Sequence, residues 1–174
     1  MVSDNWRFID TAEFARLGST LEGTLPLAEL IRLCEGLPQQ PNESAVSWSL
    51  KGWRTNGGQA FIQVSLKARP VLQCQRCLEP FGFDVDVVNQ VELVNRETDL
   101  EDEDLDEDAP ERILGSRRFD VMSFVEDELI LAVPYVPRHE VCPGVAPAVQ
   151  VEPPALQEKR PSPFSVLAQL KQNR

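Results

Sequence analysis

The sequence predicts a mixed α+β protein, in which a small antiparallel β-meander or partly open barrel packs against helices. Three observations support this class. The 174 residues suit one domain of ordinary size. Apolar and polar residues alternate in the middle of the chain, which is typical of strands, and apolar residues at helical spacing flank that region. We expect one domain over residues 1–134 and an extended, proline-rich tail over residues 135–174.

The N-terminal part of the domain predicts two helices and a strand. Asp10, with a glutamate three residues later, resembles a capping box, and Gly18 is a typical helix stop, so we expect a helix over 11–17. Apolar residues in the range 21–25 predict a strand. Pro26 suits the first turn of a second helix, which the next glycine would end.

The central region predicts three antiparallel strands. Residues 46–51 and 62–67 alternate strictly, and the turn residues 56–58 between them are typical of a hairpin. A third strand is expected from Phe81 onward. Its alternation is interrupted before Val91, which indicates a β-bulge.

An acidic segment separates these strands from the last helix. Residues 96–112 contain ten acidic and two basic side chains, and they hold most of the net charge of −11. Like charges repel and stay solvated, so we expect a flexible loop rather than a carboxylate site. A contact with a basic partner is the alternative use of this segment.

The C-terminal part predicts a helix, the tail and a short second helix. Asp120 can cap a helix that runs to Val133, with the acidic residues 126–128 on its solvent side. Pro134 ends it. At the end of the chain, residues 163–171 have apolar side chains at helical spacing, which predicts a short amphipathic helix that docks on its own domain or on a partner. The candidate partner-binding residues are Phe164, Leu167 and Leu170.

Basic residues gather in the predicted hairpin region. The window 44–78 contains five basic residues and no acidic residue, and aromatic residues are interleaved among them. Cations next to aromatic rings are the chemistry that binds phosphate and stacks on bases, but a solvated sheet face gives the same pattern. The candidate RNA-binding residues are the cations Lys51, Arg54, Lys67, Arg69 and Arg76, with Trp48 or Trp53 as the stacking residue.

The sharpest local motif is Cys74-Gln75-Arg76-Cys77. Two thiolates at this spacing can bind one soft metal ion from a tight turn. The single histidine, His139, stands three residues before Cys142, so the two pairs could form one structural Cys3His zinc site. Two unrelated reduced turns and a redox dithiol are the other interpretations. The strand-like residues after Cys77 disfavour the redox one, because redox Cys-x-x-Cys pairs open a helix.

Composition and missing motifs limit the remaining function classes. Four cysteines are too few for a disulfide scaffold, and the first ten residues lack the apolar core of a signal peptide. We therefore expect a cytoplasmic protein without a transmembrane helix. The sequence has no nucleophile elbow, P-loop or dinucleotide fingerprint, and with one histidine we expect no enzymatic activity. A metal-dependent nuclease built from solvated carboxylates is the least favoured alternative.

Three motifs together resemble a known family. The runs LQCQRCLEPF at 72–81, VEDELILAVP at 125–134 and PFSVLAQLK at 163–171 are similar, in this order, to the signature of the YceD-type large ribosomal RNA subunit accumulation proteins. Many relatives carry a second Cys-x-x-Cys after the helix. This chain has His139 and Cys142 there, so His139 would replace a thiolate.

The resemblance implies a bacterial ribosome biogenesis factor. Such a protein acts in the synthesis, processing or stability of 23S ribosomal RNA, and no enzymatic activity or small-molecule substrate is implied. The expected partners are large-subunit RNA, ribosomal proteins or processing proteins. The alternative is an adaptor, in which the acidic segment and the C-terminal helix recruit a processing enzyme or a basic ribosomal protein.

Overall fold

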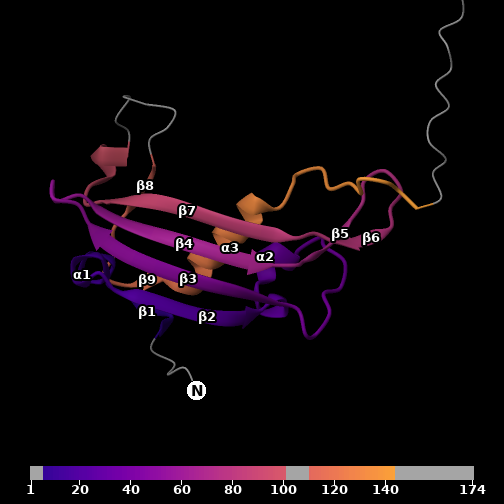
Figure 1. Ribbon diagram of the computed structural model, residues 1–174, viewed down its shortest axis with the longest axis horizontal. Helices are drawn as coiled ribbons and strands as arrows, with labels where there is room; N and C mark the ends of the chain where they lie inside the picture. The colour runs from indigo at the N-terminus through magenta and orange to yellow at the C-terminus, as the bar shows by residue number, and fades with distance from the viewer. Residues whose placement is uncertain (1–5, 101–109, 144–174) are drawn as a thin grey trace, which may run out of the picture. The chain divides into compact units, whose positions relative to one another are not determined.

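A five-stranded sheet forms the centre of the protein. The computed structural model describes residues 6–100 and 110–143 (Figure 1). The strand order is β2-β3-β4-β7-β8; the first four strands pair antiparallel, and β8 is parallel to β7. The two outer strands do not pair with each other, so the sheet is open and the predicted α+β class is confirmed. The strands are β2 (Thr20–Pro26), β3 (Ala45–Arg54), β4 (Ala60–Ala68), β7 (Val85–Val94) and β8 (Glu111–Leu114).

Two small ribbons lie outside the central sheet. Strand β1 (Phe8–Ile9) pairs with β9 (Phe119–Asp120) at one end of the molecule (Figure 1). Strand β5 (Val71–Gln73) pairs with β6 (Pro80–Gly82) at the other. Both pairs are antiparallel. The β1–β9 ribbon thus joins residues from before and after the β3–β4 hairpin, whereas both strands of the β5–β6 ribbon follow it.

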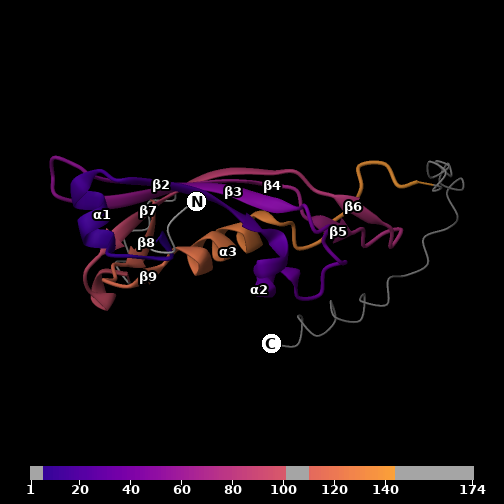
Figure 2. The same ribbon diagram turned by 90° about the horizontal axis from the view of Figure 1, so that it is seen from below.

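The helices cover one face of the sheet. The helical elements are α1 (Thr11–Leu17), η2 (Leu27–Glu29), α2 (Ile31–Cys34), η3 (Glu97–Leu100) and α3 (Val121–Ala132). Figure 2 shows α2 and α3 beneath the sheet, with α1 near the end that carries β1 and β9. Within the described residues, the opposite face of the sheet carries no helix.

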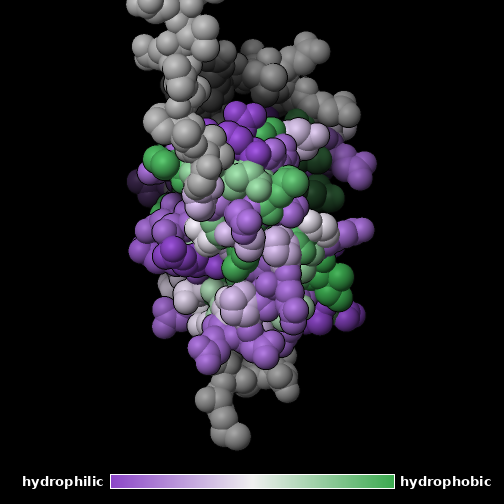
Figure 3. Space-filling view, turned by 90° about the vertical axis from the view of Figure 1, so that its right-hand side faces the viewer, coloured by the Kyte–Doolittle hydropathy of each residue, from purple (hydrophilic) through white to green (hydrophobic). Residues whose placement is uncertain are grey.

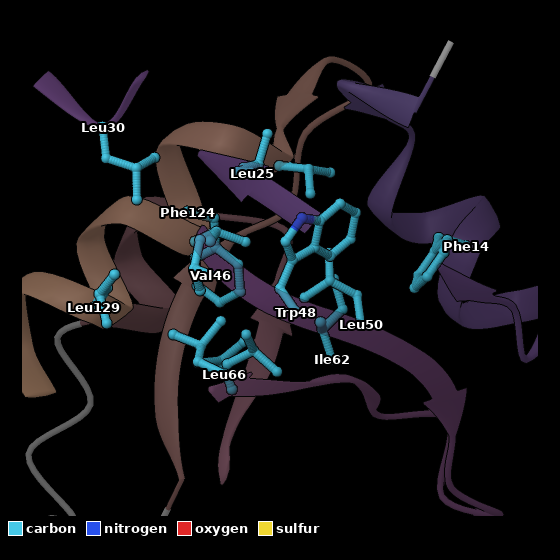
Figure 4. Close-up of a cluster of buried hydrophobic side chains, with 14 of the residues drawn as sticks. Phe14, Leu25, Leu30, Val46, Trp48, Leu50, Ile62, Leu66, Phe124 and Leu129 are labelled. Atoms are coloured by element: carbon cyan, nitrogen blue, oxygen red, sulfur yellow. The ribbon is translucent and has the colours of Figure 1, made fainter. Parts of the chain in front are cut away.

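The core lies between the sheet and these helices (Figure 4). Alternate residues of β3 point inward: Val46 and Leu50 are fully buried and Trp48 is 4% exposed. Phe124 and Leu129 of α3 pack on them from below. The strict alternation that predicts the hairpin therefore separates the residues that face the core from those that face solvent.

Helices α1 and α3 begin and end where the sequence predicts. The Asp10 carboxylate accepts a hydrogen bond from the Glu13 backbone N–H, and Gly18 ends α1 in the left-handed conformation with φ 63°. Asp120 caps α3 through the backbone N–H groups of Met122 and Ser123. These caps satisfy N–H groups that have no partner within the helix.

Three predicted elements differ from the structure. The helix expected from Pro26 is divided at Leu30 into η2 and α2, and Pro26 belongs to β2. The strand expected from Phe81 is two strands in different sheets, because the chain turns out of β6 before it enters β7. The predicted bulge is wrong: β7 pairs with β4 without interruption, and Asn89 takes an inward position that the apolar pattern does not reveal.

The acidic segment is also more ordered than predicted. It contains η3 at one end and the start of β8 at the other, while residues 101–109 lie outside the described part of the chain. On α3, only Asp127 of the three acidic residues faces solvent; Glu126 is 7% and Glu128 is 6% exposed. The prediction that all three are solvated is therefore wrong.

The first compact unit of the chain ends at Cys142. Residues 135–142, which the sequence assigns to the tail, belong to this unit, and the carbonyls of Tyr135, Pro137 and His139 accept hydrogen bonds from the turn between β5 and β6. The predicted helix at 163–171, with Phe164, Leu167 and Leu170, lies outside the described residues. Among the helices of the described part, none has the length and apolarity that a membrane crossing requires.

Candidate metal centre

The turn between β5 and β6 brings Cys74 and Cys77 together. The Cys74 N–H donates to the carbonyl of Glu79 at 3.0 Å, which closes the ribbon at its tip. The Leu78 N–H donates to the Cys74 carbonyl at 2.8 Å, and Leu78 adopts a φ of 65°. A residue other than glycine is strained in the left-handed region, so the ribbon and the tight turn together must hold Leu78 in this conformation.

The segment after α3 supplies the other two donors. The Gln75 N–H donates to the carbonyl of Pro137 at 2.9 Å, which ties this segment to the turn. His139 then packs its ring against Phe81, with 4.6 Å between the ring centroids. Cys142 is 3% exposed and Cys74 is fully buried. The two pairs found in the sequence therefore meet at the end of the sheet that carries β5 and β6.

The four donor atoms have the separations of a tetrahedral site. All lie within 4.8 Å of one another. The sulfurs of Cys74 and Cys142 are 3.7 Å apart, and the Cys77 sulfur is 3.3 Å from Nδ1 of His139. Zinc bonded to sulfur at ~2.3 Å and to nitrogen at ~2.0–2.1 Å would place such donors roughly 3.6–3.8 Å apart. The cluster is therefore compatible with a metal site, as the sequence predicts.

Backbone groups prepare Cys74 to bind a cation. Burial of its sulfur opposes ionisation, but the backbone N–H groups of Cys77, His139 and Arg76 outweigh this effect and lower the pKa of Cys74 to about 5. The pKa of Cys77 is raised: the backbone N–H of Glu79 favours its thiolate, but burial and the neighbouring Cys142 and Cys74 outweigh it. Thiolates this close together repel one another, and a cation bound between them would stabilise their charged forms.

Arg76 belongs to this centre rather than to the predicted RNA-binding face. Its Nε donates to the Cys142 sulfur at 2.8 Å, and its Nη2 donates to the His139 carbonyl at 3.4 Å. The neighbouring thiol groups raise the pKa of Arg76, chiefly through the hydrogen bond to Cys142. The position of Arg76 between Cys74 and Cys77 already indicates that it lies next to the metal centre. Nothing in the sequence pattern indicates that Phe81 packs on His139.

The other cations of the predicted face do not form one cluster. Lys67 pairs with Asp86 at 3.0 Å, and Arg69 pairs with Asp84 at 3.2 Å, so acidic residues of the next strand region offset both charges. Lys51 and Arg54 are exposed, and no ion pair with another described residue is found for either. These pairs also occupy two of the carboxylates considered for a nuclease.

The two candidate stacking residues differ. Trp48 is buried in the core and packs on Trp6, with 5.2 Å between ring centroids, so it cannot reach a surface ligand. Trp48 is therefore not a stacking residue, because the alternation of β3 places it on the inward face with Val46 and Leu50. Trp53 is half-buried and stacks on Phe61 at 5.5 Å. It lies on the outer face and remains a candidate.

Comparisons with known proteins agree with the resemblance. A family model described as "Large ribosomal RNA subunit accumulation protein YceD" matches residues 62–171, which include all four donors. A protein of the same description from Haemophilus influenzae is 37% identical over 110 residues. The alignment covers 58% of this chain and 59% of that relative, less than two thirds of its length. No solved structure matches the chain.

Proposed function

The chain belongs to the YceD family of large ribosomal RNA subunit accumulation proteins, and from this membership we propose that it supports accumulation of 23S ribosomal RNA without catalysing a reaction. It acts in the synthesis, processing or stability of this RNA by binding RNA directly. The observation that carries the proposal is the family match, which spans the metal centre and α3. Crosslinking in cells, with identification of the bound RNA and proteins, tests it. Recovery of proteins only, without large-subunit RNA, contradicts direct binding.

The chemistry of the metal centre supports a non-catalytic role. Three thiolates and one imidazole provide four protein ligands, which is the full set of a structural zinc site. A catalytic zinc keeps one position for water or substrate. Zinc bound here would cross-link the β5–β6 ribbon to the segment after α3. We therefore propose one structural zinc ion and no other cofactor.

Metal analysis of the purified protein tests the zinc proposal. We expect about one equivalent of zinc per chain in the wild type and in Cys34→Ser, because Cys34 lies away from the four donors and its sulfur contacts the Leu27 carbonyl at 3.2 Å. The variant Cys77→Ser should lose most of the metal. Less than about a tenth of an equivalent in the wild type, with all thiols free, would rule out the zinc site.

The exposed Lys51 and Arg54 support RNA contact at the predicted face. Both lie in β3 and carry charges that no described acidic residue offsets. We expect binding to large-subunit RNA fragments to be strongest at low salt, because each phosphate contact releases counterions. Charge reversal at Lys51, Lys67 and Arg69 together should weaken binding. Binding that survives this change places the contact elsewhere.

Exposed apolar side chains near the metal centre favour a second candidate, a protein adaptor. Tyr135 is 96%, Val141 83% and Leu78 66% exposed. Apolar patches lie among hydrophilic residues on the end of the molecule that carries β5 and β6 (Figure 3). Surfaces of this kind mark protein partners. Pull-downs with Tyr135→Ser, with residues 161–174 deleted and with residues 99–108 neutralised test it; retention of all partners in every variant contradicts the adaptor.

A further inference from the structure

A groove at the end of the sheet opposite the metal centre gathers arginines that the sequence does not bring together. It has a volume of ≈ 830 Å³ and lies between α1, the β3–β4 turn, the end of β7 and the β8–β9 connection. These elements meet at the left of Figure 1. Four arginines line it: Arg16, Arg54, Arg112 and Arg117. Only Arg54 belongs to the basic window of the sequence.

The carboxylates of the groove are engaged within the protein. Asp10 accepts from a backbone N–H as the cap of α1. Glu13 binds Arg16, and Glu92 binds Arg112 at 3.3 Å. The fourth carboxylate, Asp99, accepts a hydrogen bond from its neighbour Thr98. Two of the four arginines are thus neutralised by a bonded carboxylate.

Arg54 and Arg117 remain available to an external anion. Both are exposed, and neither forms an ion pair with any described residue. Arg117 is held in place from the other side, because its neighbour Ser116 exchanges hydrogen bonds with Thr11: the Ser116 N–H donates to Oγ1 at 2.9 Å, and the Ser116 carbonyl accepts from the Thr11 N–H at 3.0 Å. A fixed backbone lowers the entropy lost when the side chain binds phosphate.

An arginine supported by an aromatic ring stands beside the groove. The guanidinium carbon of Arg118 lies 4.4 Å from the centroid of the Phe8 ring, and that of Arg7 lies 5.5 Å from it. Phe8 is 40% exposed. Bases of single-stranded RNA stack on arginine planes and aromatic rings, and the pairing of the two orders the cation before the ligand arrives. Arg7 also binds Asp120 at 3.3 Å, so it contributes less free charge.

We propose that this groove and the adjoining Arg118–Phe8 pair bind a single-stranded segment of RNA, with Arg54 and Arg117 on phosphates and Arg118 with Phe8 under a base. The proposal rests on the proposed function and assigns the RNA contact to a surface that the sequence-predicted residues miss, Arg54 excepted. Single-stranded RNA fits better than a duplex, because the stacking groups need unpaired bases. Trp53, which precedes Arg54 in β3, offers a second aromatic group near the same rim.

Fluorescence anisotropy with a labelled oligouridine tests the proposal on the full zinc-loaded chain. The triple variant Arg54→Gln, Arg117→Gln and Arg118→Gln should bind at least about tenfold more weakly, and the slope of log affinity against log salt should fall by about 1.4, because two phosphate contacts of a single strand are lost. Phe8→Ala should weaken binding by about fivefold or more, because it removes the support for stacking, and should leave the salt slope nearly unchanged. Arg138→Gln is the matched control, because it removes an exposed arginine that lies next to the metal centre, at the other end of the sheet.

The outcomes separate this proposal from the proposed function. Circular dichroism and thermal denaturation of each variant show whether it is folded, and the salt slope reports cations at the RNA even where a variant is less stable. Wild-type binding that the triple variant retains and that the control or charge reversal at Lys51 abolishes overturns the groove and leaves RNA binding intact. No binding by the wild type overturns direct RNA contact altogether. Equal affinity for a duplex overturns the single-stranded assignment.

Discussion

Arg76 donates a hydrogen bond from Nε to the sulfur of Cys142 at 2.8 Å and thereby places a fixed positive charge on the metal centre. Three thiolates and one neutral imidazole around a divalent ion leave one net negative charge. The guanidinium offsets it and also orients the sulfur. Partners of this kind stabilise metal sites although they bind no metal themselves.

Replacement of Arg76 should therefore weaken metal retention. We expect Arg76→Ala to lower zinc affinity by about 10- to 100-fold, as loss of such supporting hydrogen bonds commonly does. Competition with a chromophoric chelator measures the affinity. Arg69→Ala, which removes an exposed ion pair, is the control and should leave it unchanged. Equal affinity of Arg76→Ala and wild type would show that the hydrogen bond has no role in metal binding.

Glu126 connects α3 to α2 and should be a major contributor to stability. Its carboxylate accepts hydrogen bonds from the Arg32 and Leu33 backbone N–H groups and from Nε of Arg32. Glu126→Ala leaves these donors without their partner, so we expect a loss of about 2–4 kcal/mol in the free energy of unfolding. Asp127→Ala removes only the exposed pair with Arg32 and should cost about 1 kcal/mol or less. Denaturant titration compares them; equal losses would contradict the prediction.

Gly52 allows α1 to lie directly on β3. A Cβ at this position would stand 2.7 Å from Cδ1 of Phe14 and 2.9 Å from its carbonyl oxygen. Gly52→Ala should therefore displace α1 and destabilise the fold by about 1–3 kcal/mol. A Cβ at Gly57 meets no atom closer than 3.7 Å, so Gly57→Ala is the matched control. Thermal denaturation distinguishes the two, and an unchanged melting temperature for Gly52→Ala would sink the packing argument.

Glu128 should make stability depend on pH. Burial raises its pKa, although Asn89 donates a hydrogen bond that acts in the opposite direction. The folded protein then holds this proton more tightly than the unfolded chain, so the stabilisation is complete below the ordinary pKa of 4.5 and is lost as the pH rises through the raised value.

The neutral variant Glu128→Gln tests this sign. It should melt at a higher temperature than the wild type at neutral pH, and the difference should shrink near pH 4.5. Glu22→Gln, on the exposed face of β2, controls for the change in net charge. A difference between Glu128→Gln and wild type that grows as the pH falls would contradict the assignment.

Local rules predicted the elements whose stability is local. The caps Asp10 and Asp120 and the stop Gly18 place two helices correctly, because the groups that satisfy a helix end lie within a few residues of it. The 46–51 and 62–67 hairpin was predicted for the same reason: its turn residues lie between two strictly alternating strands. The Cys and His pairs were predicted as one possible zinc centre because each pair has a spacing that lets two side chains bind the same ion.

The same local rules did not predict features that depend on contacts between residues distant in the sequence. Strand β8 is acidic at its start and pairs in parallel with β7 across the acidic segment, which no turn signal announces. Glu126 has the sequence context of a solvated residue but completes the N-terminus of α2, a segment 94 residues away. Phe8 and Arg118 come together because β1 pairs with β9. The order and pairing of the strands bring these side chains together, and the periodicity of apolar residues does not reveal it.

The candidate metal centre brings together Cys77 and His139, residues separated by 62 positions, so zinc bound there would close a ring that contains β7, β8 and α3. A cross-link over a loop of this length removes conformational freedom from the unfolded chain, on the order of 4 kcal/mol in the chain-entropy view. During synthesis the four-donor site can be completed only after Cys142 has left the ribosome. Zinc capture by this protein would therefore mark the moment at which its fold is complete.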